Sequence, residues 1–396
     1  MKLLTIKITA LAIILFTLTD VSCDSFFRGI DYNYQPPELK NDGLEVGNAK
    51  DSHINTRYLE HAVKTIKKGK FNEIHSILIY RKDKLVFEEY FEGHKYQWNA
   101  SKYHGEKVQW NSSMKHQIMS CTKSFTSACI GIAVKLGYIK SVEQSIFDYL
   151  PEHQHLKTNN RKYITIEHLL TMTSGLAWDE WSTSHGGDFT NDIDHLWLVK
   201  DPVTNVLERE WWAAPGEFFT YNGGGMVILG EILNNATGMN AGEFSEKYLF
   251  EPLAIESAEW TRYPGGLFDT AGSLRITPCD MLKLGILYLN NGNWNGEQIL
   301  APEWIEKSST VYKNNSGINV PIEDSEKNGY GYTWWVTEFN HAGETINMYR
   351  ANGWGGQTIM VLPELETVVV FTSGNYTKNS KLFKLVKNYV LPSIQI

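Results

Sequence analysis

The hydrophobic pattern gives the first part of the chain a helix followed by a strand pair. In "LEHAVKTIKKG" (59–69) apolar residues recur at helical spacing and Gly69 follows as a stop, which predicts an amphipathic helix. "HSILIYRKDKLVFEEYFEG" (75–93) then has two apolar runs around the polar turn at 82–83. This arrangement is typical of a β-hairpin.

A matching pair of apolar runs lies near the other end of the chain, in "QTIMVLPELETVVVFTSG" (357–374), and a helical stretch follows from about Lys378 to Val390. Between the two ends, helical periodicity and loops dominate. We therefore expect an α/β (α+β) fold in which both ends of the chain form one antiparallel sheet flanked by helices. The sheet part would be about 53–109 and 253–396, and the inserted, mostly helical part about 110–252.

The first 23 residues have the layout of a secretory signal peptide. Two lysines precede the apolar run "ITALAIILFTL" (8–18), and "TDVSC" ends at Cys23. Cys23 resembles the cysteine of a bacterial lipoprotein signal, so attachment to the membrane through a lipidated Cys23 and simple cleavage are both open. The protein is thus expected to be exported, either periplasmic or secreted. The polar segment 24–52 is predicted to be a linker, and 53–396 a single domain.

Composition excludes several classes of protein. The 396 residues are 42% hydrophobic, enough for a large core, and the net charge of −8 without a dense basic cluster disfavours nucleic acid as a partner. No H-E-x-x-H occurs, no cysteine pair has zinc spacing, and His153 and His155 are expected to be solvated. We therefore expect no metal and no cofactor. Cys121 and Cys129 would lie roughly 12 Å apart on one predicted helix, too far for a disulfide bond. The spacing of the cysteines predicts no set of disulfides.

Candidate chemistry begins with "HQIMSCTKSFTSACIGIAVKLG" (116–137), in which Ser120 and Lys123 form a Ser-x-x-Lys tetrad. The tetrad is weak alone, because a second copy runs from Ser112 to Lys115 in a stretch without helical periodicity. After Ser120, however, apolar and small residues recur at helical spacing up to Gly137, which predicts a helix with a buried face.

A serine in the first turn of such a helix can act as a nucleophile. Unpaired N–H groups and the helix dipole stabilise negative charge there, and the amine of Lys123 at i+3 can reach the Ser120 hydroxyl. Lys123 could act as a base only if burial or a nearby cation lowered its pKa. The simpler alternative is a helix-capping serine with an exposed lysine.

Further stretches carry a family resemblance. "TIEHLLTMTSGL" (165–176), "PGEFFTYNGGGMVILGEIL" (215–233) and the segment from Ala271 resemble the serine β-lactamase-like and penicillin-binding superfamily over about 75–375. The likeness is to its class C-like branch, which holds esterases, D-amino-acid peptidases and 6-aminohexanoate-oligomer hydrolases. The family's Tyr-x-Asn triad reads Tyr221-Asn222-Gly223 here.

The resemblance implies the roles of the site residues. Ser120, Lys123 and Tyr221 would be catalytic, with Lys123 or Tyr221 as the base. The backbone N–H groups of Ser120 and Trp354 would form the oxyanion hole. The residues expected to bind substrate are Asn222, Gly353, Gly355 and Gly356.

The third sequence box of the family differs in this chain, and the difference limits which substrates we expect. The third family box falls at 351–353 and reads Ala-Asn-Gly, without the Lys or His of penicillin-recognising members. Arg350 would either replace that cation or be a surface residue. Since the box helps to hold the carboxylate of a β-lactam, β-lactam hydrolysis is not the expected main activity.

The sequence thus predicts a serine hydrolase that cleaves a small ester or amide through an acyl-enzyme. A peptidoglycan enzyme of the D-peptidase or penicillin-binding type, and a non-catalytic envelope binding protein of the same fold, remain as alternatives. An α/β-hydrolase is disfavoured, because the chain has no G-x-S-x-G elbow. The physiological substrate and the oligomeric state stay open.

Overall fold

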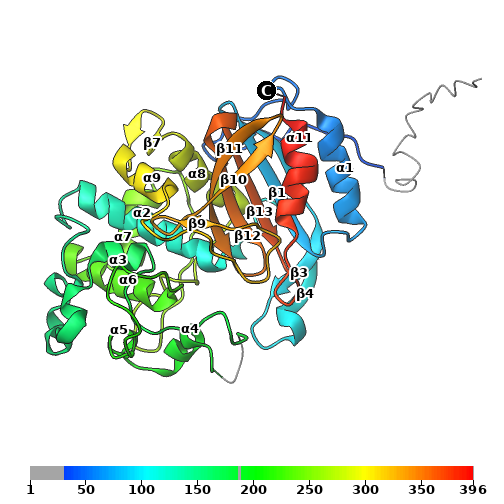
Figure 1. The fold of residues 1–396 in the computed structure, drawn as a ribbon. Helices are drawn as coiled ribbons and strands as arrows, with labels where there is room; N and C mark the ends of the chain where they lie inside the picture. The colour runs from blue at the N-terminus through cyan, green and yellow to red at the C-terminus, as the bar shows by residue number, and fades with distance from the viewer. Residues whose placement is uncertain (1–30, 186–188, 396) are drawn as a thin grey trace, which may run out of the picture.

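A seven-stranded antiparallel sheet forms the centre of the molecule (Figure 1). The structure is a computed structural model that describes residues 31–185 and 189–395, so the predicted signal peptide and Cys23 lie outside the described residues. In spatial order the strands are β2 (Lys84–Tyr90), β1 (Ile74–Arg81), β13 (Thr367–Ser373), β12 (Gln357–Leu362), β11 (Glu344–Gly353), β10 (Trp335–His341) and β9 (Gly329–Tyr330).

Both ends of the chain build this sheet, as predicted. β1 pairs with β13, and Leu78 lies opposite Val370. The predicted turn between β1 and β2 is formed by Lys82 and Asp83, whose φ angles of 49° and 61° place both in the left-handed region. Two such residues give the backbone twist that suits a two-residue hairpin. The α/β fold class with an antiparallel sheet is therefore confirmed.

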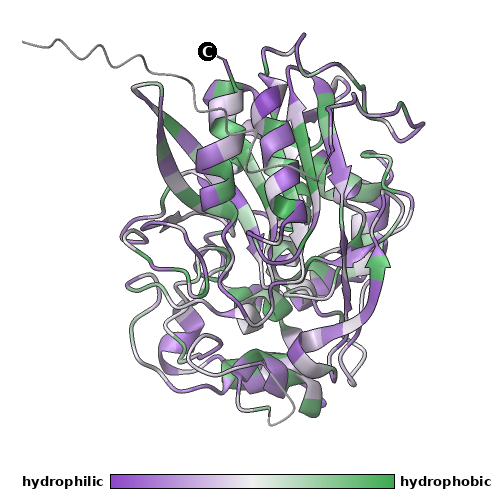
Figure 2. Cartoon of the chain, turned by 90° about the vertical axis from the view of Figure 1, so that its right-hand side faces the viewer, coloured by the Kyte–Doolittle hydropathy of each residue, from purple (hydrophilic) through white to green (hydrophobic). Residues whose placement is uncertain are grey.

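Helices cover both faces of the sheet. The predicted first helix is α1 (Thr56–Lys67), and it packs with the C-terminal helices α10 (Leu382–Leu385), η10 (Val386–Val390) and α11 (Leu391–Ser393) on one face (Figure 1). In Figure 2, which faces these helices, hydrophilic and hydrophobic bands alternate along them. α8 (Pro278–Leu289) contacts β12 and β13 on the opposite face.

The remaining elements are short or belong to the helical part. The helices are α2 (Thr122–Lys135), α3 (Ile166–Leu170), α4 (Asp192–His195), α5 (Pro202–Leu207), α6 (Gly223–Thr237), α7 (Ala241–Ser245) and α9 (Pro302–Ser309). The short strands are β3 (Glu92–Tyr96), β4 (His104–Gln109), β5 (His116–Gln117), β6 (Arg275–Ile276), β7 (Asn293–Trp294) and β8 (Glu297–Gln298). Single turns occur at η2 (Ser101–Tyr103), η3 (Met119–Cys121), η4 (Ile146–Asp148), η5 (Pro151–Leu156), η6 (Asn159–Tyr163), η7 (Leu196–Leu198), η8 (Glu246–Phe250) and η9 (Pro363–Leu365).

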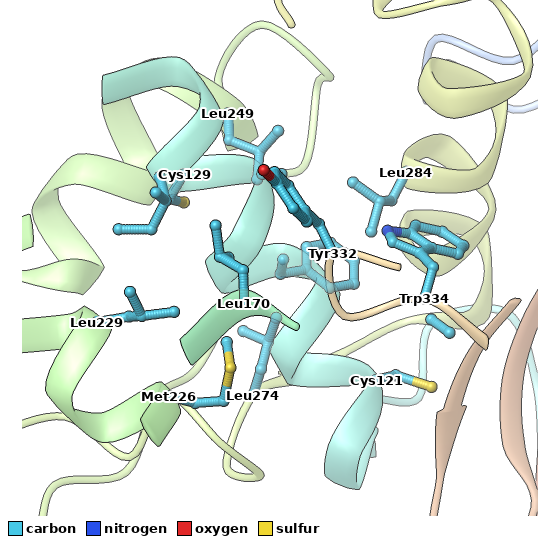
Figure 3. Packing of buried hydrophobic residues seen from close by; sticks show 14 of the residues in the cluster. Cys121, Cys129, Leu170, Met226, Leu229, Leu249, Leu274, Leu284, Tyr332 and Trp334 are labelled. Carbon is cyan, nitrogen blue, oxygen red and sulfur yellow. The ribbon is translucent and has the colours of Figure 1, made fainter. Parts of the chain in front are cut away.

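The helix predicted after Ser120 is buried on all sides and not on one face alone. Every residue of α2 from Thr122 to Ala133 is buried, and Figure 3 shows side chains from several elements around it. Its polar positions find partners, because the hydroxyls of Ser124 and Thr126 donate to backbone carbonyls of neighbouring segments. Leu136, which we expected on the buried face, is 47% exposed. α2 is thus the central helix of the larger hydrophobic core.

The segment predicted to be a linker packs against the domain from Tyr34 onward. The Tyr34 hydroxyl donates to the Val86 carbonyl at 2.9 Å, and its ring stacks on Phe87. Leu44 and Ala49 are buried in the two cores. The folded unit therefore begins before residue 53, because apolar side chains spaced among polar ones in 31–52 cover the edge of the sheet.

The prediction that His153 and His155 are solvated is wrong for His153 and confirmed for His155. His153 is buried and lies 3.4 Å from a carboxylate oxygen of Asp201, so it is not solvated, whereas His155 is exposed.

The three cysteines among the described residues, Cys121, Cys129 and Cys279, are buried and form no disulfide. Across the residues that the structure describes, no helix combines the length and the apolar character needed to cross a membrane.

Candidate active site

Ser120 lies in a tight turn where the chain enters the central helix. It belongs to η3, directly before α2, and is partly exposed. The preceding residue, Met119, has a φ of 49°, a conformation that side-chain-bearing residues rarely adopt and that is often retained at functional sites. This backbone conformation presents Ser120 at the end of a helix that is otherwise enclosed.

Lys123 is buried against Ser120. Its side chain is 3% exposed, and its Nζ lies 2.9 Å from Ser120 Oγ and 3.0 Å from the Ala271 carbonyl oxygen. Burial lowers the pKa of the Lys123 amine, and the nearby carboxylates of Glu180 and Asp269 oppose that shift. The arrangement differs from a capping serine with an exposed lysine, since the N-cap position is Cys121 and Lys123 is enclosed.

The second Ser-x-x-Lys tetrad has another environment. Lys115 forms an ion pair with Glu259 at 2.6 Å, and the preceding residues 111–114 form an irregular loop at the surface. Lys115 is therefore engaged by a carboxylate and not by Ser112.

Tyr221 completes the group around Ser120. Lys123 Nζ lies 5.0 Å from its ring centroid, and the interaction of its phenol with Ser120 acts to lower the Tyr221 pKa. The ring stacks on Trp181 and on Trp335, at centroid distances of 5.1 and 5.8 Å. Desolvation first and the charge of Glu180 second raise the pKa of Tyr221 well above its usual value, so the phenol stays protonated at neutral pH.

The turn that holds Tyr221 explains why position 223, where the family's Tyr-x-Asn triad has asparagine, is a glycine in this chain. Asn222 caps α6, with its Oδ1 accepting from the Gly225 N–H at 3.0 Å, and its own N–H contacts Met172 Sδ. The Gly223 N–H donates to Glu180 Oε2 at 2.8 Å, and a Cβ added at 223 would lie equally close to that oxygen. Glycine at 223 therefore makes room for the carboxylate of Glu180.

Glu180 and Asp269 are site residues that the sequence did not reveal. Glu180 is 8% exposed, its Oε1 lies 3.9 Å from Lys123 Nζ, and its Oε2 accepts from Trp178 Nε1 at 2.6 Å. Asp269 is also buried, and its Oδ1 accepts from the Ala271 N–H, which orients the segment whose carbonyl meets Lys123. Both residues come from loops without a motif, and Glu180 stands out only as the acidic residue in "AWDEW".

The end of β11 meets the turn that contains Ser120 at Gly353. A Cβ added there would lie 2.4 Å from the Ile118 carbonyl oxygen, so only glycine allows this approach. Gly355 and Gly356 have φ angles of 83° and 93° and shape the following turn. Side chains added at these two positions would meet Tyr376 and Ser373, so the structure brings Gly353 to the site but gives the other two glycines a packing role.

Trp354 and Arg350 are both held by other parts of the protein. Trp354 Nε1 donates to the Tyr376 carbonyl, and its ring packs edge-on against Tyr103 at 4.7 Å between centroids. Arg350 is neither a surface residue nor a free cation. It is fully buried, and its guanidinium pairs with Glu323 at 2.6 Å and with Asn328 at 2.9 Å.

A cavity of about 410 Å³ adjoins these groups. Aromatic side chains dominate its wall, and two acidic residues add polar atoms. The lining residues are Ala177, Trp178, Asp179, Glu180, Trp181, Trp212, Phe219, Thr220 and Tyr221. Glu180 and Tyr221 belong both to this wall and to the surroundings of Lys123, so the cavity lies next to the Ser120–Lys123 pair.

A comparison of the sequence with known protein families shows which family this chain belongs to. The model of the Beta-lactamase family matches residues 75–386, which include all of the groups just described. The chain belongs to the Beta-lactamase family. Membership in the family agrees with the sheet built from both ends and with the helical insertion between them.

The relatives within this family are distant. An uncharacterized protein of Alkalihalophilus pseudofirmus is 25% identical over 74% of this chain and 82% of its own length. The 6-aminohexanoate-dimer hydrolase of Paenarthrobacter ureafaciens is 22% identical, over 65% of each chain. A solved structure, a putative 6-aminohexanoate-dimer hydrolase from Bacillus anthracis, superposes with a TM-score of 0.66 at 22% identity, over 83% of this chain and 80% of that one. At this identity the structural likeness shows the fold alone.

Proposed function

We propose that the protein is a serine hydrolase that cleaves an ester or linear amide through an acyl-enzyme on Ser120. The observation that carries the proposal is the buried Lys123 amine 2.9 Å from the Ser120 hydroxyl. A nucleophile and a base within hydrogen-bonding reach, with the base positioned by a third group, is the arrangement that acyl transfer requires. The Ala271 carbonyl supplies that third contact.

In the proposed first step, Ser120 Oγ attacks the substrate carbonyl while neutral Lys123 takes the proton of the hydroxyl. Burial favours the neutral amine, which makes Lys123 the better base. Tyr221, whose raised pKa keeps it protonated, relays the proton to the leaving group as the carbon–oxygen or carbon–nitrogen bond breaks. Water then attacks the acyl-enzyme by the same proton path in reverse.

The oxyanion would be bound by the backbone N–H groups of Ser120 and Trp354. Two observations support this assignment: Ser120 precedes the first turn of α2, and the backbone of Gly353 touches the nucleophile turn. Such fixed donors stabilise the charge that develops in the transition state. The edge contacts of the Trp354 ring hold this segment in place.

The wall of the cavity supports a substrate with an apolar acyl or amine part. Trp181 stacks on Tyr221 beside the nucleophile, and Trp212 and Phe219 extend the aromatic surface. Ala351 replaces the cationic residue of the third family box, and Arg350 is already paired with Glu323. We therefore propose that uncharged or weakly charged short esters and linear amides, and not β-lactams, are the preferred substrates.

A substrate panel tests this proposal. The purified protein is assayed with p-nitrophenyl esters, a linear ω-amino-acid dimer, a D-Ala-D-Ala peptide and nitrocefin, beside Ser120→Ala and the matched control Ser112→Ala. We expect turnover of esters or the linear dimer to exceed that of nitrocefin, with loss only in Ser120→Ala. Binding without turnover of any member would support the non-catalytic alternative. Nitrocefin as the fastest substrate would overturn the assigned preference.

A further inference from the structure

A cluster of metal-ligating side chains lies outside the proposed active site. Glu73 directly precedes β1, His94 is on β3, and His104 begins β4. One ligand atom from each of the three lies within 4.8 Å of the other two. Segments that are separate in the sequence thus meet at the small hairpin β3–β4, which lies beside the central sheet (Figure 1).

The three side chains face one another closely. His94 Nδ1 lies 2.6 Å from Glu73 Oε1, and His104 Nε2 lies 3.2 Å from Glu73 Oε2. The two imidazole rings stack at 4.5 Å between centroids with an angle of 8° between their planes. All three side chains are partly buried, with 17%, 31% and 22% exposure for Glu73, His94 and His104. The cluster is therefore reachable from solvent but held by the fold.

A third histidine, beside the cluster, supplies a further observation. His75 is fully buried, and its Nε2 has no hydrogen-bond partner among the described residues. That nitrogen lies 3.9 Å from Glu73 Oε1, the oxygen that also faces His94. Buried polar atoms normally have partners, so a nitrogen without one, 3.9 Å from a carboxylate oxygen that also faces His94, supports a ligand at this place. The other nitrogen of His75 is 3.2 Å from His116 Nε2, which fixes the ring.

We propose that Glu73, His94 and His104 bind one divalent transition-metal ion, with His75 facing the same ion. Two imidazoles and one carboxylate are a ligand set that zinc uses, whereas calcium and magnesium take oxygen ligands. The contact of His75 with His116 is of the kind that orients a metal-facing histidine from outside the ligand sphere.

The ion would fasten the hairpin to the sheet beside the proposed oxyanion segment. Tyr96 and Tyr103, on and beside the same hairpin, pack on the Trp354 ring. On the other side, His116 lies in β5, four residues before Ser120. The proposed metal is thus structural: it ties the hairpin β3–β4 to the start of β1, and none of its three ligands is a residue of the proposed catalytic group.

Zinc binding to the chelator-treated, metal-free protein tests the proposal. Titration calorimetry is expected to show one zinc ion per chain, and His94→Ala and His104→Ala are each expected to weaken binding at least 10-fold. His155→Ala, which removes an exposed histidine elsewhere, is the matched control and should bind like the parent. Zinc at about 100 times its Kd should raise the Tm of the parent by roughly 3–4 °C. Absence of zinc binding, or equal binding by all variants, would overturn the proposal.

A measurement on the parent alone avoids any dependence on how the variants fold. Diethyl pyrocarbonate modifies accessible imidazoles, and mass spectrometry locates the adducts. Added zinc should protect His94 and His104 while leaving His155 reactive. Unchanged modification of His94 and His104 at saturating zinc would contradict the assignment. Neither readout depends on hydrolysis, so this proposal can fail while the proposed function holds, and the reverse.

Discussion

Burial is what distinguishes Lys123 from Lys115 at the scale of single residues. Both lysines stand three positions after a serine, but the Lys123 side chain is 3% exposed and meets Ser120, whereas Lys115 pairs with Glu259. An enclosed amine loses hydration that stabilises its charge, so its pKa falls and a larger share of it is neutral and able to accept a proton. The ability of the lysine to act as a base therefore depends on the structural environment of the Ser-x-x-Lys tetrad and not on its sequence alone.

Replacing Lys123 tests this distinction. Lys123→Ala should lower kcat for a p-nitrophenyl ester by about 10²- to 10⁴-fold with little change in KM, because the amine acts on the proton and not on substrate binding. Lys115→Ala is the control and should retain parental kinetics. A change confined to KM in Lys123→Ala would place the residue in binding instead.

Glu180 sets the pH dependence. Its carboxylate, 3.9 Å from Lys123, favours the charged amine and so raises the Lys123 pKa relative to burial alone. In Glu180→Gln the amide oxygen can still accept from Trp178 and Gly223, but the negative charge is gone. Because the proposed mechanism requires neutral Lys123, the acid limb of the kcat/KM profile should move to lower pH, by about one unit. A limb that stays in place or moves to higher pH would contradict this role.

Site residues that lie in recognisable motifs could be predicted from the sequence, whereas site residues that lie in loops without a motif could not. Ser120, Lys123 and Tyr221 could be named because they stand in stretches with recognisable spacing, and the structure brings them together. Glu180 and Asp269 could not, since their place beside Lys123 depends on how two loops fold back. A histidine cluster gathered from three segments likewise has no sequence spacing to detect.

At the scale of elements, the contact between β11 and η3 determines the geometry around the nucleophile. Gly353 lets the strand approach the Ile118 carbonyl, and a methyl group there would sit at 2.4 Å from that oxygen. The closest atom, the Ile118 carbonyl oxygen, belongs to the backbone, so this contact can be relieved only by moving the strand or the turn.

Gly353→Ala should therefore lower kcat for an ester at least 10-fold while the protein remains folded, because it displaces the proposed oxyanion segment from Ser120. Gly343→Ala is the matched control at the far end of the same strand pair. It forces an alanine to φ near 90° in open space, so it should cost about 1 kcal/mol of stability without loss of kcat. Steady-state kinetics and urea unfolding separate the two effects. Equal kcat in both variants would contradict the account.

Local pattern predicted the hairpins and the first helix because their signals are short-range. The turn at 82–83 and the pairing of β1 with β2 are encoded within one stretch. The complete burial of α2 was not predicted, because hydroxyl side chains such as Ser124 and Thr126 look polar in sequence until their carbonyl partners are known.

The whole molecule is larger than the predicted domain at its N-terminal side. Residues 31–52 have little regular structure, yet they place Leu44 and Ala49 in the cores and Tyr34 on Phe87. The prediction of a linker failed because isolated apolar residues within a polar, proline-containing stretch give no periodic signal. The joining of both ends of the chain in one antiparallel sheet, in contrast, was predictable from the two strand-rich ends.

Leu44→Ala tests whether this segment stabilises the fold. The side chain is 5% exposed within the larger core, so its truncation should lower the free energy of unfolding by about 2–5 kcal/mol. Leu39→Ala is the matched control, since Leu39 is 71% exposed, and it should change stability by no more than about 0.5 kcal/mol. Urea unfolding measures both, and similar values for the two variants would mean that the segment is only loosely attached.

The most direct test of the central claim is to locate the covalent adduct that a fluorophosphonate forms with the protein. Peptide mass spectrometry of the labelled parent should find one adduct, on Ser120, and labelling should persist in Ser112→Ala but disappear in Ser120→Ala. An adduct on another residue, or undiminished labelling of Ser120→Ala, would contradict the assignment of Ser120 as the nucleophile.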